Sequence, residues 1–174
     1  MIEPPTSGRW MHLRGTVAEL GAWHAEGIGS SGRVAVQPGA YRLGAPAVPI
    51  LACHGRHSAD PLGWVVDLWE ADGHVWVEGL LGGHPLSEAY AFDVRRGSAA
   101  ALSVGERDRR VSRGLVLSST VREVSLVTSG ADTTARVRES WWIDFTEGEH
   151  VAPAQLAIVD RVRRAVERLE AAAA

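Results

Sequence analysis

The chain contains no lysine and no asparagine, and Cys53 is its only cysteine. All 18 basic residues are therefore arginines, which excludes Ser–Lys dyads, Schiff-base lysines and the lysine of a P-loop. A single cysteine also excludes an internal disulfide and a zinc cluster of several thiolates. No apolar run approaches the roughly 18 residues of a membrane span. The formal net charge of −3 favours neither nucleic acid nor an anionic membrane as a partner.

The 174 residues suffice for one domain with a sizeable core, since domains commonly hold about 100–200 residues. The first ten residues, MIEPPTSGRW, carry an acid and two prolines where a signal peptide would have basic residues and then an apolar stretch. We therefore expect the protein to be kept in a cytoplasm, and we interpret residues 1–13 as a loose leader.

Short apolar runs separated by glycine extend from residue 14 to about residue 137 and are typical of β-structure. The runs at 48–54, 98–106 and 113–128 predict strands, and those at 63–70 and 74–81 flank a hairpin turn at 71–73. Helical spacing over 84–97, closed by Gly97, predicts one inserted helix. The pattern as a whole predicts a mainly β fold with helices (α+β), built as a small barrel or sandwich with helices outside.

Residues 138–174 form the predicted C-terminal extension. Its first part is aromatic and acidic and shows no clear period, whereas residues 153–170 predict an amphipathic helix. The apolar stripe of this helix would pack either on the β-body or on a second copy or partner protein. The stripe consists of Leu156, Val159, Val162, Val166 and Leu169.

Ser103 is the first candidate for chemistry. Strand alternation places it on one face with Ala99, Ala101 and Gly105, whose small side chains leave room beside the hydroxyl. That room would admit a substrate backbone next to a nucleophile. A thin strand packed under a helix would show the same pattern, so both interpretations stand at this point.

Glu123 is the second candidate. The segment VREVSLV around it is apolar on both strand faces, which predicts burial on both sides. A buried carboxylate needs a hydrogen-bonding or charged partner. An arginine would be the structural partner, whereas a histidine would be the functional one, because a carboxylate on an imidazole fixes the tautomer of a general base.

His54 ends the predicted strand at 48–54, where the chain leaves the core for a loop. Functional side chains are often presented at such positions, and the ordinary pKa of histidine suits a base at neutral pH. A rival interpretation is a metal-dependent hydrolase that uses His54 and His57 with His74 or Asp60. The spacing H-x-x-H on a loop supports this rival weakly, because a loop does not fix both imidazoles as a helix does.

The order of these motifs resembles the prohead (capsid maturation) serine protease family of tailed phages, which is related in fold to the herpesvirus maturation protease, assemblin. The resemblance covers residues 14–137, and EVSLV following LSVG is its most specific part. The chain departs from the family pattern at Cys53, at Glu106 and over residues 129–132. The matching segments are VQPGAY (36–41), VPILACH (48–54), PLGWVVDLWEADGHVWVEGLL (61–81), ALSVG (101–105) and VREVSLVTSGADTTARV (121–137).

The resemblance implies a small antiparallel β-barrel of herpesvirus-protease type, surrounded by helices. It also implies a serine endopeptidase with a Ser103–His54–Glu123 triad and neither a metal nor a cofactor. Such an enzyme would work in a host cytoplasm inside an assembling procapsid and would cut the scaffold, or a scaffolding segment of the major capsid protein, and itself. The resemblance is also compatible with self-association into a homo-oligomer. The alternative is a catalytically inactive capsid-assembly or scaffold-docking protein of the same fold.

Overall fold

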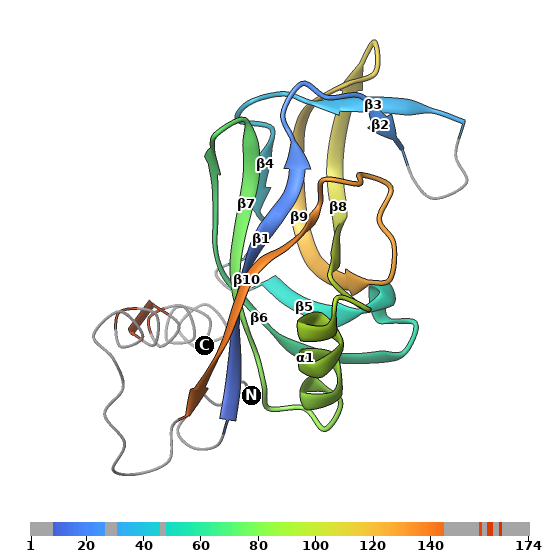
Figure 1. Cartoon of the computed structure of the whole chain (residues 1–174). Coiled ribbons are helices and arrows are strands. Elements are labelled where there is room, and N and C mark those ends of the chain that lie inside the picture. The colour runs from blue at the N-terminus through green and yellow to red at the C-terminus, as the bar shows by residue number, and fades with distance from the viewer. Residues whose placement is uncertain are drawn as a thin grey trace.

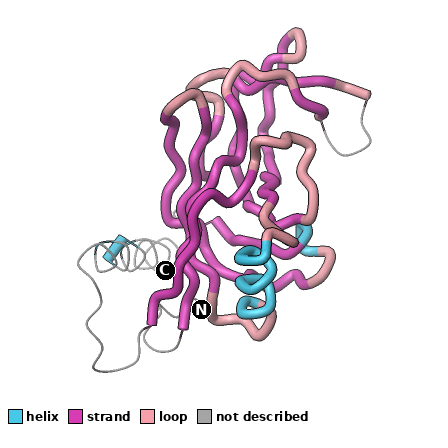
Figure 2. Tube along the Cα trace, viewed as in Figure 1, coloured by secondary structure: helices cyan, strands magenta, loops and turns pink. Residues whose placement is uncertain are grey.

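The computed structural model describes residues 9–26, 31–45 and 48–144, together with Ala157, Asp160, Arg161 and Arg164. The described chain is mostly strand, with one α-helix and one short 3-10 turn (Figures 1 and 2). The elements are β1 (Arg9–Glu19), β2 (His24–Ala25), β3 (Arg33–Val36), β4 (Tyr41–Leu43), β5 (Val48–Ala52), η1 (Cys53–Gly55), β6 (Ser58–Ala71), β7 (His74–Leu81), α1 (Ser87–Arg96), β8 (Ala101–Ser112), β9 (Leu115–Val127) and β10 (Arg136–Asp144).

The strand pairings form a circuit that runs through β9, β5, β6, β7, β1, β10 and β8 and returns to β9. The join between β10 and β8 is narrow and consists of one residue pair, Arg136 with Ala101. The sheet is mixed, not purely antiparallel as expected, because β3, β4 and β5 each pair with β9 in parallel. β9 runs antiparallel to β8, which precedes it in the chain, and lies beside β5 in the same direction.

The predicted hairpin and inserted helix are confirmed. β6 and β7 pair up to Ala71 and His74, and the turn residues Asp72 and Gly73 both have positive φ, 50° and 72°. A two-residue turn of this kind matches the twist of the two strands. α1 ends at Arg96, and Gly97 closes it in the left-handed conformation with φ of 79°.

Three expectations about the periphery need correction. β1 begins at Arg9, inside the segment expected to be a leader, because apolar side chains from Trp10 onward pack into the core. β10 crosses the boundary expected at residue 137, where its aromatic side chains pair with β1. Among the described residues α1 is the only complete α-helix, and within that part of the chain helices do not surround the sheet. The predicted apolar stripe at 156–169 lies outside the described residues.

The core lies inside the circuit of strands and is filled by aliphatic side chains from nearly every strand. None of the described helices is long and apolar enough to cross a membrane. Among the largest fully buried side chains are Met11, Leu13, Ile50, Leu62, Leu80, Leu81, Leu102, Leu126 and Ile143.

One buried polar cluster joins β1 and β7 to the C-terminal extension. His12 is fully buried, stacks on Trp141, and its Nε2 lies 2.8 Å from Oε1 of Glu78. Arg161 Nη2 lies 3.1 Å from both carboxylate oxygens of Glu78. Burial alone would raise the pKa of Glu78, but the His12 hydrogen bond and the nearby charges of Arg161, His12 and Arg14 outweigh it and hold the pKa below its ordinary value.

Replacing Glu78 by glutamine should lower the free energy of unfolding at neutral pH by about 1–3 kcal/mol, because His12 and Arg161 then lose their charged partner. A carboxyl whose folded pKa is lowered stabilises the fold above its unfolded pKa, and this contribution disappears as the pH falls through the folded value. The difference between wild type and Glu78→Gln should therefore narrow as the pH falls below the ordinary value of 4.5. Denaturant titrations at several pH values around 4.5 measure this difference in the free energy of unfolding, and Glu88→Gln, at an exposed residue, is the control. A difference that does not change with pH would contradict the lowered pKa of Glu78.

Candidate active site

His54 is positioned by an abrupt end to β5. The strand pairs in parallel with β9 up to Ala52, and Cys53, His54 and Gly55 then all take positive φ, 48°, 59° and 75°. Left-handed backbone at two successive non-glycine residues is costly and clusters at functional sites. The turn lifts the His54 ring out of the sheet, and 41% of this side chain is exposed.

Glu123, from β9, is the partner of His54. Its Oε1 lies 2.6 Å from Nδ1 of the imidazole, and its side chain is only 14% exposed. The partner is therefore the histidine and not an arginine. With Nδ1 donating to the carboxylate, the neutral ring has its lone pair on Nε2, which is the arrangement that a general base requires.

Ser103 lies on β8 next to this pair. It pairs directly with Ser125 of β9, and Gly105 pairs with Glu123 in the same antiparallel ladder. Residues directly opposite in such a ladder share one face, with Cβ atoms about 4.5–5.5 Å apart. The half-buried Ser103 side chain therefore shares a face with Glu123, whose carboxylate holds the His54 ring. Among the described residues no hydrogen bond joins the Ser103 hydroxyl to that ring.

Gly105 provides the space that the Glu123 carboxylate occupies. A Cβ built on Gly105 would lie 2.3 Å from Oε1 of Glu123 and 2.6 Å from its Cγ. Its φ is not in the positive region, so the requirement for glycine is one of space and not of backbone conformation. A glycine inside a strand often marks such a close approach, and this signal is present in the sequence LSVG.

Gly105→Ala should therefore displace the Glu123 carboxylate and break its hydrogen bond with His54 while the β8–β9 ladder persists. The low-field proton resonance of a histidine Nδ1–H bound to a carboxylate reports the bond directly. We expect this resonance in the wild-type spectrum and expect its loss in Gly105→Ala, with circular dichroism unchanged. A retained resonance would show that the pocket tolerates a methyl group.

The rival metal set does not gather around His54. The Nδ1 atom of His57 contacts the hydroxyl of Tyr90 on α1, and that of His74 lies 2.8 Å from the carbonyl oxygen of Asp72 in its own turn. In the described part of the chain no group of three His, Cys, Asp or Glu side chains could hold a metal ion. Burial raises the pKa of Tyr90, as do Cys53 and Asp93 nearby, so α1 packs close to the turn that carries His54.

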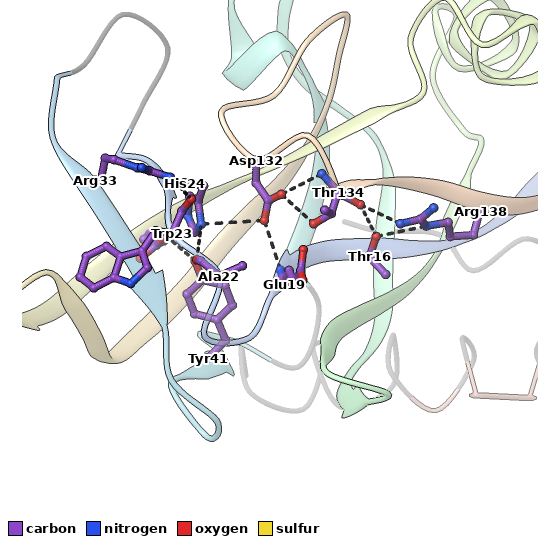
Figure 3. Close-up of polar contacts among 11 residues, drawn as sticks. Thr16, Glu19, Ala22, Trp23, His24, Arg33, Tyr41, Asp132, Thr134 and Arg138 are labelled. Carbon is purple, nitrogen blue, oxygen red and sulfur yellow. Dashed lines mark hydrogen bonds and ion pairs between the residues drawn. The ribbon is translucent and has the colours of Figure 1, made fainter.

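The segment between β9 and β10 lies against the start of β8, and Asp132 ties it to the end of β1. Its Oδ1 accepts hydrogen bonds from the backbone N–H and hydroxyl of Thr134, at 2.8 and 2.7 Å, and its Oδ2 accepts one from the N–H of Glu19 at 3.2 Å (Figure 3). A Cβ on Gly130 would lie 3.2 Å from the carbonyl oxygen of Leu102. The segment therefore lies against the residue that precedes Ser103. No local sequence pattern indicates this anchoring.

Glu106, where the chain departs from the family pattern, belongs to a separate polar cluster. Its carboxylate accepts hydrogen bonds from the hydroxyls of Tyr41 at 2.9 Å and Ser119 at 2.6 Å. Burial raises the pKa of Tyr41 well above its ordinary range, and the neighbouring Glu106 charge raises it further. Glu106 is thus held by side chains of β4 and β9 and is not a fourth member of the His54 site.

No family model matches this chain, and no curated protein sequence matches it. Its structural neighbours are herpesvirus proteases. The protease of Kaposi's sarcoma herpesvirus in complex with an allosteric inhibitor is 15% identical, with 94% of this chain and 92% of that chain covered and a TM-score of 0.49. The varicella-zoster virus protease is 11% identical, with 89% and 76% covered and a TM-score of 0.43.

Proposed function

We propose that the protein is a serine endopeptidase in which Ser103 is the nucleophile, His54 the general base and Glu123 the residue that orients it. The observation that carries the proposal is the 2.6 Å hydrogen bond between Glu123 and Nδ1 of a half-exposed histidine. Ser103 supports it, because its hydroxyl lies on the same face of the β8–β9 ladder. A base held by a carboxylate beside a serine is the arrangement that activates a hydroxyl for acyl transfer.

The mechanism follows from the roles of these atoms. Oγ of Ser103 attacks the peptide carbonyl carbon while Nε2 of His54 takes the hydroxyl proton, and the resulting imidazolium is stabilised by Glu123. His54 then gives this proton to the leaving amine as the C–N bond breaks, which leaves an acyl-serine. Water attacks the acyl group, His54 takes the water proton and returns it to Ser103, and the carboxylic acid product departs.

An oxyanion hole is also required, and its donors need to lie beside Ser103. We place the candidates among the backbone N–H groups of residues 128–131. Two contacts support this placement: the N–H of Leu102 donates to the carbonyl of Ala135 at 3.0 Å, and Gly130 lies against Leu102. Asp132 fixes this segment to β1, so its N–H groups would be held in place before substrate binds.

We further propose that the substrate is the scaffold, or the scaffolding segment of the major capsid protein, of a tailed phage or prophage, and that the enzyme also cuts itself. Support comes from the order of LSVG and EVSLV in the chain, which matches the prohead protease pattern. On this proposal the protease acts inside the procapsid in the host cytoplasm and associates with itself there.

Co-expression tests this function directly. The protein is produced together with the major capsid protein that we propose as its substrate, and the products are analysed by intact mass. We expect a shortened capsid protein whose new N-terminus is absent when His54→Ala replaces the wild type. An unprocessed capsid protein in both cultures would oppose the proposed substrate.

The second candidate is an inactive assembly protein of the same fold. It is favoured by one observation: among the described residues, no hydrogen bond joins Ser103 to His54. Catalytic hydrogen bonds are often long before substrate binds, so an enzyme without substrate can have the same arrangement. The two candidates differ in whether Ser103 reacts with a phosphonate probe, because an inactive scaffold has no activated hydroxyl.

A further inference from the structure

Ser125 links the two partners of the His54–Glu123 pair. Its hydroxyl donates a hydrogen bond to Oε2 of Glu123 at 2.5 Å and accepts one from the backbone N–H of His54 at 2.9 Å. Together with the bond from Glu123 to the His54 ring, these contacts close a ring of hydrogen bonds through the three residues. The Ser125 side chain is fully buried, so the ring is sheltered from water on this side.

The end of β5 explains why a hydroxyl is needed at this position. The parallel ladder with β9 pairs Leu51 with Ser125 and stops at Ala52. The left-handed turn then carries the His54 N–H away from the ladder, where a buried donor without a partner would be costly. The Ser125 hydroxyl satisfies this N–H and so fixes the backbone of the histidine as well as the carboxylate that holds its ring.

Burial and hydrogen bonding separate Ser125 from the nucleophile. Ser125 is 0% exposed and its proton is directed to Glu123, whereas Ser103, directly opposite on β8, is half-buried. An attacking hydroxyl needs access to substrate and a base that takes its proton. Ser125 is closed to substrate, and its proton is already held by the Glu123 carboxylate, so it is not placed to attack.

We propose that Ser125 is a positioning residue that sets the orientation of His54 by holding both its backbone and the second oxygen of Glu123. This inference rests on the proposed serine protease function and deepens it. Removing the Ser125 hydroxyl breaks two hydrogen bonds, one to Oε2 of Glu123 and one to the backbone N–H of His54. The imidazole is then no longer held in one orientation.

The test is the rate at which a fluorophosphonate probe modifies Ser103, measured by intact mass on the full chain. A misplacement of about 1 Å can cost on the order of 100-fold in rate, so we expect Ser125→Ala to slow labelling by about 10- to 100-fold. Ser125→Thr, which keeps the hydroxyl, should recover most of the loss. The low-field Nδ1–H resonance should broaden or vanish in Ser125→Ala and persist in Ser125→Thr.

Ser119→Ala is the matched control. Ser119 is also a buried serine of β9, and its hydroxyl also donates to a carboxylate, that of Glu106 at 2.6 Å. Its loss should lower stability to a similar extent while the labelling rate and the resonance stay unchanged. If the role of Ser125 were purely structural, Ser125→Ala and Ser119→Ala would show the same labelling rate of Ser103 and the same Nδ1–H resonance.

The outcomes distinguish this inference from the function on which it rests. Labelling of Ser103 at the wild-type rate in Ser125→Ala would overturn the positioning role and leave the protease function intact. A wild-type protein that is not labelled at Ser103 would overturn the proposed function itself. If Ser125→Ala does not fold, Ser125→Cys takes its place, because the thiol keeps the shape but donates weakly. The same slowing is then expected, and a wild-type rate in that variant would overturn the inference.

Discussion

Ser103→Ala is expected to abolish cleavage of the co-expressed capsid or scaffold protein while the fold stays intact. Loss of a triad member costs on the order of 10⁴–10⁶ in rate in serine proteases, because no other group can form the acyl intermediate. The substitution removes one oxygen from a half-buried position among small side chains, so little packing is lost. Time courses of processing, with circular dichroism on both proteins, measure the effect.

The control for this variant is Ser118→Ala, a serine further along the same β8–β9 ladder that pairs with Arg110. It should process the substrate at the wild-type rate. Processing at that rate by Ser103→Ala would rule out Ser103 as the nucleophile, and the buried Ser125 could then be considered only together with a large movement of β8.

Glu123→Gln is expected to lower the rate by about 10⁴, by analogy with triad aspartates. The amide has nearly the same shape, but it does not stabilise an imidazolium and can hold the ring in the wrong tautomer. The protein should remain folded, because an amide oxygen can still accept a hydrogen bond from Ser125. The loss of rate is measured as the rate of substrate processing at saturating protease, compared between Glu123→Gln and wild type.

Glu123→Ala separates the catalytic role from the structural one. It should lose activity and also lower the free energy of unfolding by about 1–3 kcal/mol, because Ser125 and the His54 ring both lose a buried partner. Full activity in Glu123→Gln would make Glu123 a structural carboxylate.

Local elements were predictable because their signals are local. The turn at Asp72 and Gly73, the helix ended by Gly97 and the strand that leads to His54 all depend on residues within a few positions of each other. The need of Glu123 for a partner was predictable too, since a carboxylate between apolar strand faces cannot stay unpaired. Its choice of histidine was predictable only through the family resemblance, because chemistry alone equally allows an arginine.

The arrangement that makes the site was not predictable from the sequence pattern. It depends on the parallel pairing of β5 with β9, and the paired residues Leu51 and Ser125 are far apart in the chain. That pairing brings the Ser125 hydroxyl to the backbone N–H of His54. The left-handed turn at Cys53 comes directly after it. β10 was missed for another reason, since its strand pattern is obscured by consecutive aromatic residues that pair with β1.

The most direct test of the central claim is the intact mass of the protein after reaction with a fluorophosphonate, followed by identification of the modified peptide. We expect a single phosphonyl group on Ser103 in the wild type, and none in His54→Ala over the same time. The test needs no knowledge of the natural substrate, because it asks only whether His54 and Glu123 activate this hydroxyl. A wild-type protein that stays unmodified, or one that is modified at another residue, would show that Ser103 is not an activated nucleophile.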